Sequence, residues 1–467
     1  MRWKKYASHP EGRDFHRALQ SFALAAILAV LPSVASAETP ITPDQYTEYQ
    51  AAPETERIRL LIHLAKSGQH DLAKALLRQF PLQGQHAGNR TLYIEGLIRR
   101  ANRDFTGAAE RFRAALADDP KLTLVRSDLA EVLYELEQDE SALHHLRRLQ
   151  ADAPDAEAAA GIGSFIDRID SRTPYRFNAY LAAAPTTNVN SGSIRKKIYL
   201  PGGFEMDINE SSKRKSGLGA AAGFNASYSR RLGNELMVVI AGGVDGTLYD
   251  NSDYNSLSLS QSAELRALTE GGYASFGFIA SQSLETDRVG YNYIAYGPRV
   301  SWRHSITHNN LFNLSATYEL RDYANDSDRD GGAFLLNGAL THLFDSSFSA
   351  TVSGGYTNTS VRDEAAAPGI AYEAYLAGLS FYKELPHGIT LNTSLDLQYS
   401  EFKDDFLVFF EPREDLRTTA SATITKRDIN WFGFAPSVQY TYTWNDSKYA
   451  IYDFDTHALD LRLTKDF

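Results

Sequence analysis

The sequence predicts an α + membrane-β protein, in which N-terminal helical repeats precede a C-terminal antiparallel transmembrane β-barrel of about 14 strands. Three observations predict this fold. Residues 43–170 carry apolar residues at helical spacing, residues 173–467 alternate polar and apolar residues, and the connections between the alternating segments are short and long in turn. The chain has no cysteine, which excludes disulfide bonds, thiolate metal sites and thiol nucleophiles.

Residues 1–37 have the features of a secretory signal peptide. A basic segment precedes the apolar stretch 22–31, and Ala35-Ser36-Ala37 matches an A-x-A cleavage site, so we expect the mature chain to begin near Glu38. The segment holds five basic and two acidic residues, so its removal shifts the formal net charge from −11 to −14. This acidity argues against a nucleic-acid partner.

Residues 38–172 are expected to form a periplasmic domain of tetratricopeptide (TPR)-like repeats. The spacing A-x3-F-x2-A-x4-P is typical of the second helix of such a repeat, and it recurs with a 34-residue period. A small residue twelve positions earlier lets the first helix pack closely. The first copy comprises Gly96, Ala108, Phe112, Ala115 and Pro120, and the second comprises Ala130, Ala142, Leu146, Leu149 and Pro154.

TPR arrays commonly bind proteins or peptides in the groove that their first helices line. We therefore predict a client-binding face there, on side chains expected to be exposed. Its candidate residues are Arg90, Tyr93, Arg100, Ser127, Glu131, Tyr134 and Glu135. His144 and His145 are adjacent on a predicted helix and point in different directions, which argues against a metal site.

From residue 173 onward the alternation has the length of membrane-spanning strands, with segments of 12 to 15 residues. Residues 311–321, for example, place five apolar side chains on one face and polar ones on the other. We predict strands at 175–188, 216–232, 235–249, 255–269, 272–286, 291–305, 311–323, 332–344, 348–362, 370–385, 389–403, 413–426, 431–445 and 453–467.

The connections predict the orientation in the cell outer membrane. Short turns such as 233–234 and 386–388 are expected in the periplasm, and longer loops such as 189–215 and 404–412 outside. Both chain ends then lie in the periplasm, and the outer face contacts outer-membrane lipids. Inward charges are expected to shape a polar passage; they include Glu264, Arg266, Glu319, Arg321, Asp396 and Arg417.

Two segments of the barrel stand out. The alternating last strand carries Leu459, Leu461, Leu463 and the terminal aromatic Phe467, a pattern that resembles the closing signal read by the barrel assembly machinery. The loop 189–215 is unusually basic. It is interpreted as a contact for lipopolysaccharide phosphates, a plug in the lumen, or a disordered surface loop.

No catalytic motif or cofactor fingerprint appears in the chain, so neither enzymatic activity nor a cofactor is expected. Asp453, Asp455 and His457 are compatible with a catalytic group at the outer rim, but a polar barrel wall is the commoner meaning of such residues.

A periplasmic TPR segment followed by a barrel of about fourteen strands resembles the Slam family, the surface lipoprotein assembly modulators. The likeness rests on domain order, size and the alternating C-terminal segment 461–467. It implies a translocon that delivers surface lipoproteins, or secreted proteins that capture haem or iron, to the cell surface. Two alternatives remain at this point: an exopolysaccharide exporter with TPR repeats, and a diffusion porin with an accessory domain.

Overall fold

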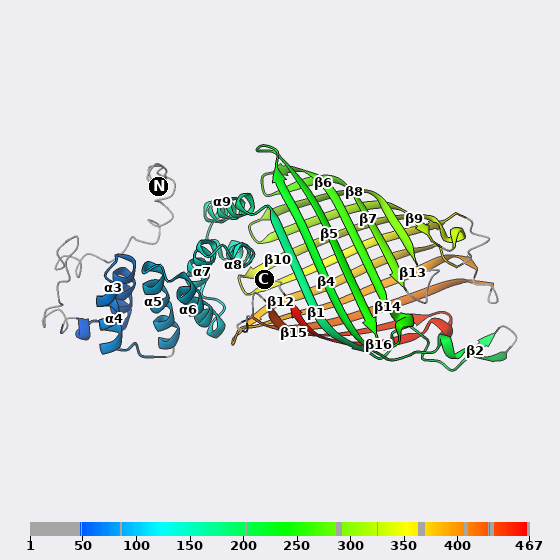
Figure 1. Ribbon diagram of the computed structural model, residues 1–467, viewed down its shortest axis with the longest axis horizontal. Helices are drawn as coiled ribbons and strands as arrows, with labels where there is room; N and C mark the ends of the chain where they lie inside the picture. The colour runs from blue at the N-terminus through cyan, green and yellow to red at the C-terminus, as the bar shows by residue number, and fades with distance from the viewer. Residues whose placement is uncertain are drawn as a thin grey trace.

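Paired helices form the N-terminal part of the computed structural model, which describes residues 47, 49–84, 86–200, 203–285, 292–324, 326–362, 369–405, 410–427, 429 and 434–464. The predicted signal peptide lies outside these residues. Successive antiparallel pairs stack side by side and lead to a single helix before the barrel (Figure 1). The helices are α3 (Glu54–Lys66), α4 (His70–Gln79), α5 (Ala87–Ala101), α6 (Phe105–Asp118), α7 (Thr123–Glu135), α8 (Asp139–Leu149) and α9 (Ala156–Arg172).

The helix pair α5–α6 shows why its sequence pattern packs. Phe112 of α6 is completely buried, and a β-carbon at Gly96 of α5 would lie only 2.4 Å from its Cε1 atom. A side chain at position 96 therefore has no room, because the aromatic ring fills the space between the two helices. In the next pair the smaller Leu146 leaves room for Ala130, and both residues are buried.

The ends of α5 and α7 repeat the same backbone geometry. Arg103 and Glu137, which are 34 residues apart, both adopt left-handed backbone angles with φ of 61° and 57°. In each case the next backbone N–H, from Asp104 or Gln138, bonds back to a carbonyl in the last helical turn at 2.9 Å. These bonds satisfy carbonyl groups at the helix end. The predicted 34-residue repeat is confirmed by this equivalence.

Fourteen strands close into one antiparallel barrel, in which each strand pairs with the next along the chain and β1 pairs with β16. This confirms the predicted fold. The barrel strands are β1 (Tyr175–Thr186), β4 (Gly217–Arg231), β5 (Leu236–Tyr249), β6 (Ser256–Thr269), β7 (Gly272–Glu285), β8 (Tyr293–Thr307), β9 (Asn310–Tyr323), β10 (Gly331–Asp345), β11 (Phe348–Val361), β12 (Tyr372–Leu385), β13 (Ile389–Asp405), β14 (Pro412–Lys426), β15 (Ala435–Ser447) and β16 (Phe454–Thr464).

The outer surface of the barrel is apolar, as contact with a bilayer requires. Leu181 on β1 is 59% exposed and Phe276 on β7 is 63% exposed. Leu459, Leu461 and Leu463 lie on this surface of β16 and are also exposed, whereas Phe467 lies outside the described residues. No helix among the described residues is long and apolar enough to cross a membrane.

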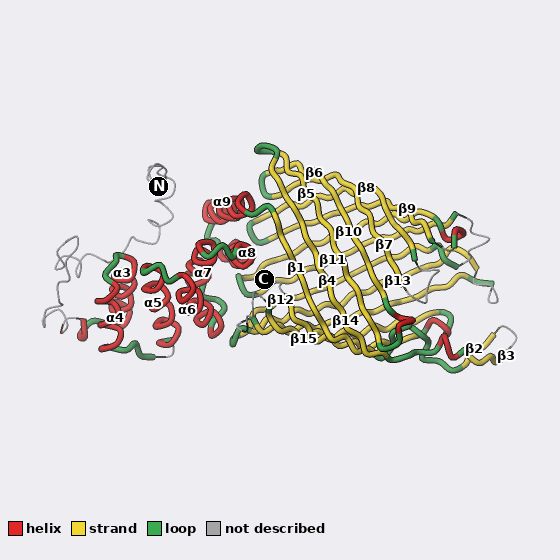
Figure 2. The backbone as a smooth tube through the Cα atoms, in the orientation of Figure 1, coloured by secondary structure: helices red, strands yellow, loops and turns green. Residues whose placement is uncertain are grey.

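The helical part lies at the end of the barrel that carries the short turns (Figure 1). Lys121, just before α7, pairs with Asp345 in the β10–β11 turn region at 3.3 Å. The Ser346 backbone N–H in the same turn donates to Asp152 at 3.0 Å. Because short turns face the periplasm in outer-membrane barrels, the helices lie on the periplasmic side. The opposite end carries the longer loops and a small hairpin of β2 (Lys197–Leu200) and β3 (Phe204–Asp207), seen at the far right in Figure 2.

The seam between β1 and β16 is interrupted within the described residues. Pairing runs from Tyr180 opposite Thr464 to Ala183 opposite Leu461, and it resumes only at Thr186 opposite Ala458. Pro185 falls in the gap, where it has no N–H to donate.

Candidate functional site

Three of the predicted groove residues belong to one polar network between α5 and α7. The Tyr93 hydroxyl donates to Asp128 at 2.7 Å, and Arg100 donates to the other oxygen of Asp128 at 2.5 Å. Arg100 also forms an ion pair with Glu131. The network ties the first helices of two successive repeats together on the predicted groove side.

The expectation that Tyr93 is exposed was wrong, because the residue is buried (9% exposed) against Phe112. Burial raises the pKa of its hydroxyl, and the negative charge of Asp128 raises it further. Asp128 itself was not predicted. The repeat register contains a signal for it, since Asp128 is 34 residues after the fully buried Ile94. An acid at the position equivalent to a core aliphatic residue indicates a buried polar partner.

The other groove candidates lie apart from this network. Arg90 pairs with Glu54 of α3 at 3.1 Å. Tyr134 lies against α9, where Phe165 packs edge-on at 5.2 Å and Arg172 stacks over its ring at 3.7 Å. Ser127 is half-buried and Glu135 is exposed. Ser127, Glu131 and Glu135 follow one another at four-residue spacing on one face of α7. Glu131 pairs with Arg100, whereas Ser127 and Glu135 make no hydrogen bond or ion pair with a described residue, and we call this face the open face of α7.

A buried charge cluster joins the helices to the barrel; we call it the junction cluster. Arg126 of α7 and Glu384 of β12 have side chains that are 0% and 1% exposed and form an ion pair at 2.7 Å. Arg427, after β14, contacts the same carboxylate at 3.0 Å, and His144 of α8 lies 3.4 Å from it. The Tyr382 hydroxyl donates to Glu384 at 2.8 Å. One carboxylate thus receives donors from both parts of the protein.

Helix α8 extends across the periplasmic mouth of the barrel from this cluster. Arg148 stacks over the Tyr382 ring at 3.5 Å and donates to Ser349 of β11 at 3.2 Å. At the other end of the helix, Glu140 lies 3.7 Å from Arg176 of β1. Glu140, His144 and Arg148 are spaced by four residues and so share one helix face. This face points into the mouth.

The two adjacent histidines lie in this junction and face different partners. His144 faces Glu384, whereas His145 lies 3.4 Å from Arg126. Burial lowers the pKa of His144, and burial with repulsion from His144 and Arg126 lowers that of His145 further. Across the part of the chain that the structure describes, no group of three or more His, Asp or Glu residues is placed to hold a metal ion.

The inner wall contains both paired and unpaired charges. Glu264 pairs with Arg266, and Glu319 pairs with Arg321, each two residues apart on one strand. These predicted lumen charges therefore neutralise each other.

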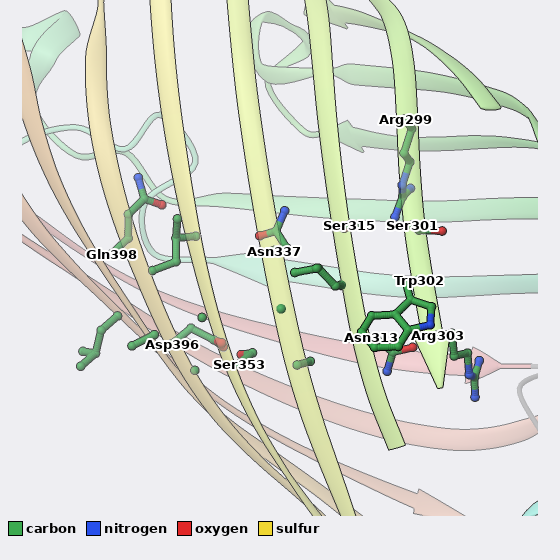
Figure 3. Close-up of a pocket in the computed structure, with 18 of the residues that line it drawn as sticks. Arg299, Ser301, Trp302, Arg303, Asn313, Ser315, Asn337, Ser353, Asp396 and Gln398 are labelled. Carbon is green, nitrogen blue, oxygen red and sulfur yellow. The ribbon is translucent and has the colours of Figure 1, made fainter. Parts of the chain in front are cut away.

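Arginines without an acidic partner line the middle of the lumen. Arg299 and Arg303 of β8 and Arg417 of β14 are exposed, and none of them forms an ion pair with a described residue. They line a cavity of about 360 Å³ with Asp396, Asn337 and Gln398, part of which is seen in Figure 3.

The basic loop after β1 contacts the last strand at the outer end of the seam. Arg195 pairs with Asp453 at 3.1 Å, and Arg214 pairs with Asp455 at 2.7 Å. His457 accepts or donates a hydrogen bond with the Tyr440 hydroxyl, and its backbone N–H donates to Thr187. The residues considered for catalysis at the rim therefore anchor the loop and the last strand. The described residues of the loop lie at the outer rim against the last strand (Figure 1), so the plug interpretation does not fit them.

Comparison with known proteins identifies the family. A family model described as surface lipoprotein assembly modifier matches residues 175–467, which begin at the first residue of β1. The chain belongs to this family. This confirms the resemblance inferred from domain order. A tetratricopeptide-repeat model matches residues 99–163, within the helical part.

A curated relative and several solved barrels are also similar. The hemophilin secretion modulator of Acinetobacter baumannii is 20% identical over 405 residues, which cover 81% of this chain and 79% of the relative. An outer-membrane channel of Pseudomonas putida is 10% identical, covers 62% of this chain and 94% of its own, and has a TM-score of 0.34. A loop-deletion mutant of OmpT from Vibrio cholerae is 8% identical, covers 62% and 98%, and has a TM-score of 0.32. The protein is an outer-membrane assembly and secretion factor of this family.

Proposed function

We propose that this protein receives one secreted client in the periplasm and delivers it to the cell surface, with the helical repeats as receptor and the barrel as route. The client is a surface lipoprotein or a secreted haem- or iron-binding protein. The family supports the first class, and the hemophilin secretion modulator supports the second. We divide the chain into a receptor unit, 38–172, and a barrel unit, 173–467.

The junction cluster is the observation that carries this division of labour. The side chains of Arg126 and Glu384 are closed to solvent in the docked arrangement, so the loss of either partner would leave a buried charge unpaired. The repeats are thus held against the mouth, and α8 lies across it. A client held by the repeats therefore lies next to the entrance of the lumen.

The open face of α7 is the part of the predicted groove that we assign to the client. Ser127 and Glu135 flank Glu131 on this face, and neither makes a hydrogen bond or ion pair with the described residues. Tyr93 contributes by fixing α7 against α5 through Asp128. Tyr134 lies under α9 and is a poorer candidate for contact.

The test is client display on intact cells. The double variant Ser127→Arg, Glu135→Arg changes the open face without touching the network, and Lys74→Glu on α4 is the matched surface control. We expect the double variant to retain the client in the periplasm while the heat-modifiable barrel stays at the wild-type level. The gene next to this one supplies the first candidate client, and surface proteolysis measures its display.

Two results would contradict the proposal. If the double variant displays the client at the wild-type level, the open face of α7 does not recognise the client. Wild-type display after deletion of residues 38–170, with an inserted barrel, would show that the repeats are not the receptor. A plain channel would then be the better interpretation.

A further inference from the structure

The periplasmic mouth is covered unevenly, and one part of it remains hollow. On the β12–β14 side, backbone N–H groups of the turn at 387–388 bond to the Ala117 carbonyl of α6, and the junction cluster lies beside them. On the other side a cavity of about 460 Å³ extends from Glu140 of α8 along the inner wall of β1 and β4–β7 to Arg299 of β8. We call this the mouth cavity.

The wall of the mouth cavity is polar and nearly free of bulky groups. Its inward side chains include Asn178, Asn225, Ser227, Ser260, Ser262 and Ser281. Amide and hydroxyl groups both donate and accept hydrogen bonds, as peptide groups do. Such a wall suits an extended polypeptide that is still hydrated, because no single sequence is required for these bonds.

The charge in and beyond the mouth cavity is mainly positive. Arg299 lines both this cavity and the lumenal cavity of about 360 Å³, so the two are adjacent. Arg303 and Arg417 lie in the lumenal cavity. The acids on this path have nearby partners. Glu140 and Asp170 both lie beside Arg176, and Glu264 pairs with Arg266. Asp396 accepts a hydrogen bond from Ser394, and Asp245 of β5 accepts one from the Tyr180 hydroxyl.

Helix α8 adds another cation to this path. Arg147 of α8 lies close to Arg176 and Arg303. Burial lowers the pKa of its guanidinium and repulsion from these two arginines lowers it further, whereas Asp170 and Glu140 raise it. Like charges at close range favour a bound anion, since a carboxylate between them relieves the repulsion.

We propose that the mouth cavity is a binding site for an acidic, extended polypeptide segment, whose carboxylates contact Arg299 and Arg303 and whose backbone contacts the Ser/Asn wall. This rests on the proposed function, since the segment belongs to the client. The site lies between the repeats and the lumen, and it favours clients whose first segment to enter the barrel is acidic.

Binding of model peptides to the purified full-length protein tests this site directly. The probes are short Glu/Gly/Ser, Gly/Ser and Lys/Gly/Ser peptides with an uncharged fluorophore, measured by anisotropy. The Glu peptide is expected to bind and the other two are not. The variant Arg299→Glu, Arg303→Glu should weaken binding about tenfold or more, because like charges then face the ligand. Arg230→Glu makes a similar charge change at an exposed position whose side chain points out of the barrel.

The lack of native cysteine allows the bound peptide to be located. With an added mild oxidant to accept the two electrons, a Glu peptide with a terminal cysteine should form a disulfide with the variant Ser281→Cys on the inner wall. It should not do so with Phe278→Cys, whose position on the same strand faces outward and is exposed. Heat-modifiability shows that each variant retains its barrel.

Several outcomes would overturn the site. The proposal fails if the wild-type protein does not bind the Glu peptide, or if the Arg299→Glu, Arg303→Glu variant binds it as tightly as the wild type. It also fails if the peptide cross-links equally at positions 281 and 278. Tighter binding of alginate oligosaccharides than of the Glu peptide would assign the cavity to a polyanionic sugar instead. Peptide binding does not depend on client display. If the wild-type protein displays its client but does not bind the Glu peptide, the site is refuted and the proposed function stands. If it binds the Glu peptide but displays no client, the function is refuted and the site stands.

Discussion

Arg126 and Glu384 are 258 residues apart in sequence, yet their side chains form a 2.7 Å ion pair that is closed to water. Arg126 also donates to the Pro120 carbonyl, at the proline that ends the second helix of a repeat. The pair therefore links the repeat geometry to the end of a barrel strand. It is the fully buried member of a set of contacts that orient the repeats on the barrel, which also includes Lys121 with Asp345 and Arg148 with Ser349.

Glu384→Gln should release the repeats from the mouth. The substitution leaves the buried Arg126 and the half-buried Arg427 without a counter-charge, and losing one partner of a buried pair costs about 3–5 kcal/mol. Hydrogen exchange of α8 and protease sensitivity between α9 and β1 should rise, while the heat-modifiable barrel persists. Glu373→Gln, near the outer end of the same strand, is the control. Unchanged exchange in α8 would show that other contacts hold the repeats.

Acidification should weaken the same junction. Burial lowers the pKa of His144 and His145 from the ordinary value of 6.5, so the docked state keeps both rings neutral where the undocked state takes up protons. Docking stability is therefore fully present above pH 6.5 and falls as the pH drops below it. Exchange of α8 amides measured from neutral to acidic pH checks this. The variant His144→Gln, His145→Gln should lose the pH dependence, and a persistent one would assign it elsewhere.

The close packing of α5 and α6 predicts two further effects. Phe112→Ala should destabilise the repeats by about 3–5 kcal/mol, since the ring is fully buried. Gly96→Ala should also destabilise them, because the added carbon meets the ring at 2.4 Å. Ala130→Gly, at the equivalent position beside Leu146, should cost only about 1 kcal/mol. Thermal unfolding of the full chain followed by the helical circular dichroism signal measures all three. Equal effects at positions 96 and 130 would contradict this account.

The sequence predicts the helices and strands well because the spacing of apolar residues that indicates each of them is local. Alternation in 311–321 predicts a strand, and β9 spans Asn310–Tyr323. The spacing of Ala108, Phe112 and Ala115 predicts a helix packed through those residues, and all three are fully buried in α6. Each prediction depends on side chains that are close to one another in the sequence.

The sites were harder to predict because they depend on distant partners. Nothing near Glu384 in sequence distinguishes it from other inward acids; its partner Arg126 lies in another domain. Tyr93 has the spacing of a groove residue, but Asp128 in the next repeat draws its hydroxyl inward. Asp453 resembles a rim acid, and only the return of the loop brings Arg195 to it. Pairings between such distant residues follow from the closed fold.

The last prediction concerns the loop across the seam of the barrel. Asp453 is buried and accepts both Arg195 and the Ser447 backbone N–H, and Asp455 accepts Arg214. Two charged contacts thus hold the loop over the outer end of β16. The hydrogen-bonded pairing of β1 with β16 is interrupted at Pro185, next to the loop. We therefore expect the loop to help hold the two strands together there.

Asp453→Asn together with Asp455→Asn should therefore free the loop without unfolding the barrel, because the inner part of the β1–β16 pairing remains. Arg195 and Arg214 are at least half exposed, so each lost contact is worth about 1 kcal/mol or less. Trypsin added to intact cells should then cut after the loop lysines and arginines, such as Lys196 and Arg214, much faster than in the wild type. Glu205→Gln, which removes only the exposed pair with Lys197 in the β2–β3 hairpin, should leave cleavage nearly unchanged. If the double variant is cut at the wild-type rate, the backbone contacts of Thr187 and Ile194 with β16 and the residue preceding it hold the loop on their own. Faster cutting together with leakage of small dyes through the barrel would show that the loop also keeps the seam closed.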